Sequence, residues 1–115
     1  MATIAYKDIN DGLRLISLSD RMDVPGTEKI EAELTGLAKV GKRNVVVDLA
    51  GVTFLSSVGI RLLIASGKAL KQEGGRMALV VGVNAGAIKT LKTTCVDAIL
   101  PMFEKLEEAE AALQN

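Results

Sequence analysis

Runs of hydrophobic residues alternate along the chain with segments whose apolar residues recur every third or fourth position. Residues 3–9 and 13–18 form two β-favouring runs on either side of an Asn-Asp-Gly turn, so they predict a β-hairpin. Residues 44–49 contain the continuous β-branched run Val45-Val46-Val47, and residues 77–83 are wholly apolar; such runs are typical of strands covered on both faces. A short edge strand is expected over residues 98–102.

The segments between these runs have the spacing of amphipathic helices. The apolar residues that mark four helices are Ile30, Leu34, Leu37 and Ala38; Ile60, Leu63, Ile64, Gly67 and Leu70; Ile88 and Leu91; and Phe103, Leu106, Ala109 and Leu113. Gly41 is expected to end the first helix and Gly74-Gly75 the second, and Asn84 is expected to cap the third. Residues 19–27 and 53–57 are expected to be loops.

The predicted order of elements is therefore β-β-α-β-α-β-α-(β)-α. Strands that alternate with helices indicate an α/β fold whose crossover connections are right-handed. We expect a mixed, mostly parallel sheet of four to five strands with the helices packed on it. The 115 residues suffice for one core but not for two, so residues 1–115 are expected to form a single domain.

The amino-acid composition excludes several classes of function. The 14 Lys and Arg residues balance the 14 Asp and Glu residues, so the chain lacks the positive charge that nucleic acids and anionic membranes attract. There is no His, which removes the commonest general base and the commonest zinc ligand, and the single Cys95 cannot form an intrachain disulfide. We therefore expect no catalytic residues, no metal and no cofactor.

Motifs for phosphate binding and for membranes are missing as well. Gly67-Lys68-Ala69 does not complete a phosphate-binding loop, and residues 82–86 lack the G-x-G-x-x-G pattern. The longest charge-free runs hold 12 residues, fewer than the about 20 that a membrane helix needs. The N-terminal residues do not have the pattern of a signal peptide, so a cytoplasmic location is expected. An interaction protein is then the leading interpretation.

Ser56 and Ser57 are the most informative polar residues. They follow the apolar strand that ends at Leu49, and they precede the helical spacing that begins at Ile60. A serine is a favoured N-cap because its oxygen accepts hydrogen bonds from the unpaired N–H groups of the first turn, so one of the two is expected to cap this helix. A phosphate there would also be favoured electrostatically.

This segment resembles the STAS domain family, specifically its anti-sigma factor antagonists. The residues that match the family pattern in register are Asp48-Leu49-Ala50, Val52, Leu55, Ser57, Gly59 and Ile60. Residues 18–23 also resemble the family's Gly-x-Leu/Ile-Asp loop, with Asp23 as the matching carboxylate. The likeness extends over nearly the whole chain, from the hairpin to the helical C-terminus.

Two positions depart from the family pattern. Ser56 stands where the family has Asp, and Val58 stands where well-studied members carry the phosphorylated residue. Because valine has no hydroxyl group, Ser57 is the first candidate for phosphorylation and Ser56 the second.

The resemblance implies partner switching. The antagonist would bind an anti-sigma factor, often a serine kinase that uses ATP, and so release a sigma factor; phosphorylation would break the complex and a serine phosphatase would restore it. The residues expected to bind the partner are Asp23, Ser56, Ser57, Val58, Gly59, Arg61 and Lys68. Arg61, Lys68 and Lys71 have the spacing of one face of the second helix and would form a docking rim with the Asp23 loop. A monomer or a weak dimer is expected.

Two other interpretations remain open. The chain can be a STAS module of another signalling complex that phosphate does not switch. Alternatively, it can be a small nucleotide- or ligand-binding protein that uses the turn at residues 82–86 and the neighbouring strand ends.

Overall fold

A mixed β-sheet organises the computed structural model, which describes residues 2–38 and 43–114. Its strands lie in sequence order, β1 (Thr3–Asn10), β2 (Leu13–Met22), β3 (Asn44–Leu55), β4 (Met77–Val80) and β5 (Met102–Phe103). The β1–β2 pair is antiparallel, and every later pair is parallel. The predicted fold class, a mixed and mostly parallel α/β sheet, is confirmed.

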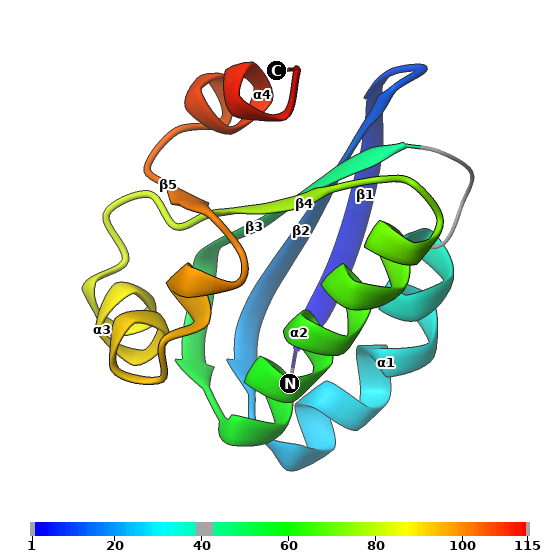
Figure 1. Ribbon diagram of the computed structural model, residues 1–115. Helices are drawn as coiled ribbons and strands as arrows, with labels where there is room; N and C mark the ends of the chain where they lie inside the picture. Colours follow the sequence, from blue (N-terminus) through cyan, green and yellow to red (C-terminus); the bar gives the residue numbers. More distant parts are fainter. Residues whose placement is uncertain (1, 39–42, 115) are drawn as a thin grey trace.

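The helices divide between the two faces of this sheet (Figure 1). They are α1 (Val24–Ala38), α2 (Ser57–Gln72), α3 (Ala85–Thr93), the short 3-10 helix η1 (Val96–Ala98) and α4 (Leu106–Gln114). Apolar residues of α1, α2, α3 and η1 share one core with the sheet, whereas α4 packs on the opposite face. No helix in residues 2–38 and 43–114 is long and apolar enough to cross a membrane.

Strand β3 shows why a central strand of this sheet contains an unbroken apolar run. Val45 and Val47 point into the core beneath α1 and α2, and Val46, between them, points into the core beneath α4. All three side chains are at most 1% exposed. Because successive side chains of a strand point to opposite faces, a strand covered on both sides needs an unbroken apolar run.

The predicted loops at residues 19–27 and 53–57 are wrong. Residues 19–22 continue β2, residues 24–27 form the first turn of α1, and residues 53–55 continue β3. Residues 19–22 and 53–55 are extended because β2 and β3 pair with each other up to their last residues. Pro25 is tolerated because the first turn of a helix leaves its N–H groups without intrahelical partners.

Three smaller predictions also need correction. Strand β4 ends at Val80 rather than Val83, because Gly82 has a φ of 57° and turns the chain towards α3. The last strand covers residues 102–103 instead of 98–102, so Phe103 belongs to β5 and not to α4. The predicted helix end at Gly41 lies outside the described residues.

Candidate functional site

Two helices begin at the same end of the sheet. Strands β2 and β3 are parallel and finish side by side, with Met22 opposite Leu55. A single residue then separates each strand from the following helix: Asp23 precedes α1 and Ser56 precedes α2. The starts of both helices therefore lie together at the carboxyl end of the sheet, at the bottom of Figure 1.

Both linking residues cap their helices in the same way. The Asp23 Oδ1 atom accepts a hydrogen bond from the Gly26 N–H at 2.9 Å. The Ser56 Oγ atom accepts one from the Gly59 N–H at 3.2 Å. In each case an oxygen side chain reaches three residues ahead to a glycine, which satisfies one of the unpaired donors of the first turn.

The two glycines allow the helix starts to approach β2 closely. A Cβ atom on Gly26 would lie 2.2 Å from the Arg21 carbonyl oxygen. A Cβ atom on Gly59 would lie 3.1 Å from Leu55 Cδ1 and 3.3 Å from the Met22 carbonyl oxygen. Gly59 was predicted to bind a partner; it is buried, and in the structure it allows the start of α2 to pack closely against Leu55 and Met22.

Ser56 is the serine that caps α2. Besides accepting from Gly59, its hydroxyl donates to the Met22 carbonyl oxygen at 2.6 Å, and its backbone N–H donates to the same oxygen at 3.1 Å. The side chain is half-buried. These hydrogen bonds link the start of α2 to the end of β2, so the Ser56 hydroxyl already both donates and accepts a hydrogen bond within the fold.

Ser57 is placed differently. It is the first residue of α2 and its side chain is exposed. Within the described part of the chain its hydroxyl makes no hydrogen bond. Val58, the next residue, is half-buried. Of the two serines, Ser57 therefore offers the accessible oxygen.

The carboxylate of Asp23 is held in its charged form. The Gly26 N–H bonded to Oδ1 is the main cause of a lowered pKa for Asp23, and Arg21, whose Nε lies 3.3 Å from Oδ2, adds to it. Arg21 also lies over the Phe54 ring, with its guanidinium carbon 4.8 Å from the ring centroid. A cation, a carboxylate and an aromatic ring thus lie in contact beside the start of α2.

Two large apolar side chains are exposed at this end of the molecule. Val24 is 49% exposed and Phe54 is 44% exposed. Together with Arg21, Asp23 and Ser57 they form what we call the sheet-end surface. Arg21, Val24 and Phe54 were not predicted from the sequence, because their segments were expected to be loops and not the ends of two paired strands and the start of a helix.

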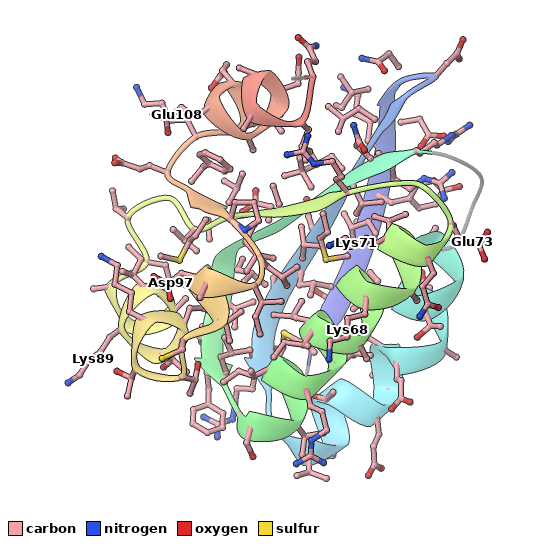
Figure 2. All side chains as sticks on the ribbon, in the orientation of Figure 1. Lys68, Lys71, Glu73, Lys89, Asp97 and Glu108 are labelled. Carbon is pink, nitrogen blue, oxygen red and sulfur yellow. The ribbon has the colours of Figure 1, made fainter. Side chains whose placement is uncertain are left out.

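The structure brings together only some of the residues predicted to bind a partner. Asp23, Ser56 and Ser57 lie at the two helix starts, and the exposed Arg61 lies about one turn further along α2. Lys68 is eleven residues beyond Ser57, so it lies about 16 Å away along the helix axis. In Figure 2, Lys68 and Lys71 occupy the other half of α2, away from its start.

Asn84 bonds the turn at residues 82–86 to both α3 and β3. The predicted cap is confirmed, because Asn84 Oδ1 accepts from the Ala87 N–H at 3.2 Å. The Asn84 amide nitrogen also donates to the carbonyl oxygens of Leu49, Ala50 and Val52, at 3.0, 3.3 and 2.7 Å. These oxygens lie on β3 beyond its last pair with β4, so Asn84 supplies partners for a free strand edge.

Residues 2–38 and 43–114 contain no group of three or more His, Cys, Asp or Glu side chains that could hold a metal ion.

Comparison with known proteins identifies relatives of the whole chain. Residues 5–109 match the family described as the STAS domain. A candidate anti-sigma factor antagonist of Bordetella bronchiseptica, BtrV, is 33% identical over 105 residues, which are 91% of this chain and 90% of that protein.

Solved structures agree with this result. The crystal structure of an anti-sigma factor antagonist from Mycobacterium paratuberculosis is 25% identical and has a TM-score of 0.88, over 100% of this chain and 96% of that one. The phosphorylated form of the Bacillus cell fate determinant SpoIIAA has a TM-score of 0.69 at 17% identity, over 96% of this chain and 98% of that one, and so shows the shared fold.

Proposed function

The chain belongs to the STAS domain family, and we propose that it acts as an anti-sigma factor antagonist that binds an anti-sigma factor through the sheet-end surface. The match over residues 5–109 and the description of the Bordetella relative support the proposal. In this function the chain needs no catalytic group of its own, because it acts by occupying a surface of its partner.

The observation that carries the proposal is that Ser57 and two large apolar side chains, Val24 and Phe54, are all exposed at the same end of the sheet. Protein interfaces are commonly anchored by aromatic residues and Arg, and are surrounded by polar groups that exclude water. Phe54 stacked beneath Arg21 has this composition. The surface is also rigid, because capping bonds and close glycine contacts fix both helix starts.

We further propose that Ser57 is the residue through which binding is switched. A serine kinase partner would transfer the terminal phosphoryl group of ATP to Ser57 Oγ, with ADP as leaving group and loss of the hydroxyl proton. A serine phosphatase would remove the phosphate by hydrolysis. Ser57 is favoured over Ser56 because modifying Ser56 would break its bonds to Met22 and Gly59.

Phosphorylation of Ser57 is compatible with the fold. A phosphate on the first residue of α2 would lie near N–H groups and the positive end of the helix dipole, so the helix should tolerate it. It would add up to two negative charges beside the ionised Asp23. The partner would then meet a changed surface on an unchanged backbone.

Calorimetric titration tests the proposal, with the anti-sigma factor whose gene lies nearest to the gene of this protein as the binding partner. Ser57→Asp should weaken binding about thirtyfold, equivalent to about 2 kcal/mol, while Ser57→Ala should bind like the wild type. Thr93→Asp, on exposed α3, is the control for added charge. Mass spectrometry after incubation with the kinase should find phosphate on Ser57. No binding by the wild-type chain would refute antagonism.

A second candidate function has its own support. Val58 occupies the position at which the resemblance implies a phosphorylated residue, and it has no hydroxyl. A STAS adaptor that binds its partner without a phosphate switch is therefore the alternative. Equal binding by Ser57→Asp and the wild type, with no phosphate on Ser56 or Ser57, would establish this alternative.

A further inference from the structure

A second surface feature lies on the other half of α2. A groove of about 380 Å³ runs between the C-terminal half of α2 and the segment that leads into β5. Met77 and Leu100 form its floor and are only 4% and 5% exposed. Ile99 forms an apolar wall and is 53% exposed. Apolar surface is thus available to an occupant along one side of the groove.

Gly67 lets the two walls approach each other. A Cβ atom at this position would lie 2.6 Å from Leu100 Cδ2, so a larger residue would push the segment away from α2. The floor of the groove is consequently set by contacts inside the fold.

The rim of the groove carries positive charge. Lys68, Lys71 and Arg76 line it, and no carboxylate does so among the residues that the structure describes. In Figure 2, Lys71 lies between α2 and the segment that leads into β5, while Glu73 points away on the far side of α2. Asp97 likewise lies on the side of η1 that faces α3. Neither of these two carboxylates lines the groove.

The two lysines are available for a partner. Both side chains are exposed, and neither forms an ion pair with any residue in the described part of the chain. They lie three residues apart on α2, so their Cα atoms are separated by about one helical turn. This spacing matches carboxylates three or four residues apart on a partner helix.

We propose that this groove is a second docking site, and that its occupant is an acidic amphipathic segment of a partner protein. Carboxylates of that segment would pair with Lys68 and Lys71, and its apolar side chains would pack against Ile99 and Leu100. The proposal does not depend on antagonism at the sheet-end surface. Lys68 lies about 16 Å along α2 from Ser57, so the domain could hold two partners at once.

Charge complementarity together with shape selects this occupant. A chain with no net charge overall places two unpaired lysines, Lys68 and Lys71, beside an apolar slot, and such a local field attracts acidic surfaces. The slot is open along one side, which suits a helix that lays its apolar stripe into a groove.

Fluorescence anisotropy with a defined probe tests the proposal. The probe is a labelled peptide of about 14 residues built from Glu, Leu and Ala at helical spacing, and its counterpart has Gln in place of Glu. Lys68→Glu/Lys71→Glu should weaken binding of the acidic peptide at least about tenfold. Lys89→Glu/Lys92→Glu, on exposed positions of α3, makes the same change in net charge and should leave binding within about twofold.

Amide chemical shifts provide the map, and a second variant tests the apolar wall. The acidic peptide should shift the amides of residues 67–77 and 99–100, and Ile99→Ser should weaken its binding while the fold melts as in the wild type. Equal affinity for the Gln peptide would overturn the proposal. Shifts at these residues with ATP or inorganic phosphate, but none with the peptide, would overturn it in favour of a small anion. A dimer dissociated by Lys68→Glu/Lys71→Glu would assign the groove to a second copy of the chain.

Discussion

Replacing Ser56 by Ala removes the cap of α2 and separates the structural serine from the exposed one. Loss of an N-cap serine costs about 1 kcal/mol. The variant also loses the hydroxyl bond to the Met22 carbonyl, which still accepts from the residue 56 N–H at 3.1 Å and is therefore not left unpaired. The combined loss of unfolding free energy should be about 1 to 2 kcal/mol.

Urea unfolding followed by far-ultraviolet circular dichroism measures this difference. For a chain of this length, 1 kcal/mol also corresponds to a fall in Tm of about 4 °C. Ser57→Ala is the matched control, because it removes the same hydroxyl from an exposed side chain that makes no hydrogen bond in the described part of the structure. It should change stability by less than about 0.5 kcal/mol.

Two further substitutions identify which bond matters. Ser56→Thr keeps a hydroxyl that can both donate and accept, so it should recover most of the loss. Ser56→Asp can accept from the Gly59 N–H, but it would set a carboxylate where the serine hydroxyl now donates to the Met22 carbonyl at 2.6 Å. It should be no more stable than Ser56→Ala. The reasoning fails if the Ser56→Ala and Ser57→Ala variants are equally stable.

Three other predictions follow from single contacts. Gly59→Ala should lower the free energy of unfolding in urea by about 1 to 3 kcal/mol, because its Cβ atom would press on Leu55. Gly36→Ala, at a position of α1 with open space around it, should raise that free energy by about 0.5 to 1 kcal/mol. The opposite order of stability would contradict the close approach of Gly59 to Leu55. Arg14 and Arg43 lower the pKa of Asp8 from 3.8 to about 2, so the contribution of Asp8 to stability is present above pH 4 and is lost as the pH falls towards 2. Asp8→Asn should therefore reduce the loss of Tm between about pH 4 and pH 2. A Tm profile identical to that of the wild type would contradict this role of Asp8. Asn84→Ala should cost about 2 to 3 kcal/mol by calorimetry, and Asn84→Asp should not restore it, because a carboxylate keeps the cap but loses the donor to three β3 carbonyls.

Sequence periodicity predicted the elements whose burial is regular. The apolar run around Val46 and the helical spacing from Ile60 to Leu70 are local signals, and the corresponding strand and helix are confirmed. Periodicity failed at residues 19–22, which are mostly polar, and at residues 53–55, although both segments belong to strands. Those segments are extended because they pair with each other, and pairing between residues more than thirty positions apart leaves no local pattern.

The site was predictable in part for the same reason. A serine cap before Ile60 follows from a local rule, but the choice of Ser56 depends on the Met22 carbonyl, 34 residues earlier in the chain. The second function of Asn84 depends likewise on carbonyl oxygens of β3. Outside the site, the burial of Arg14 also depends on contacts that are distant in sequence, because its side chain donates to Asp8 and to the Leu37 carbonyl oxygen.

In the function proposed above, the different roles of Ser56 and Ser57 would allow one short segment to be both rigid and switchable. Ser56 holds the backbone of the first turn through bonds to Met22 and Gly59, and those bonds do not involve Ser57. A charge added at Ser57 would therefore act on the partner through the surface and leave the fold as it is. It follows that Ser57→Asp should lose partner affinity without losing Tm, whereas Ser56→Ala should lose Tm first. A variant of Ser57 that loses both together would show that binding is switched by unfolding the start of α2, and not by charge.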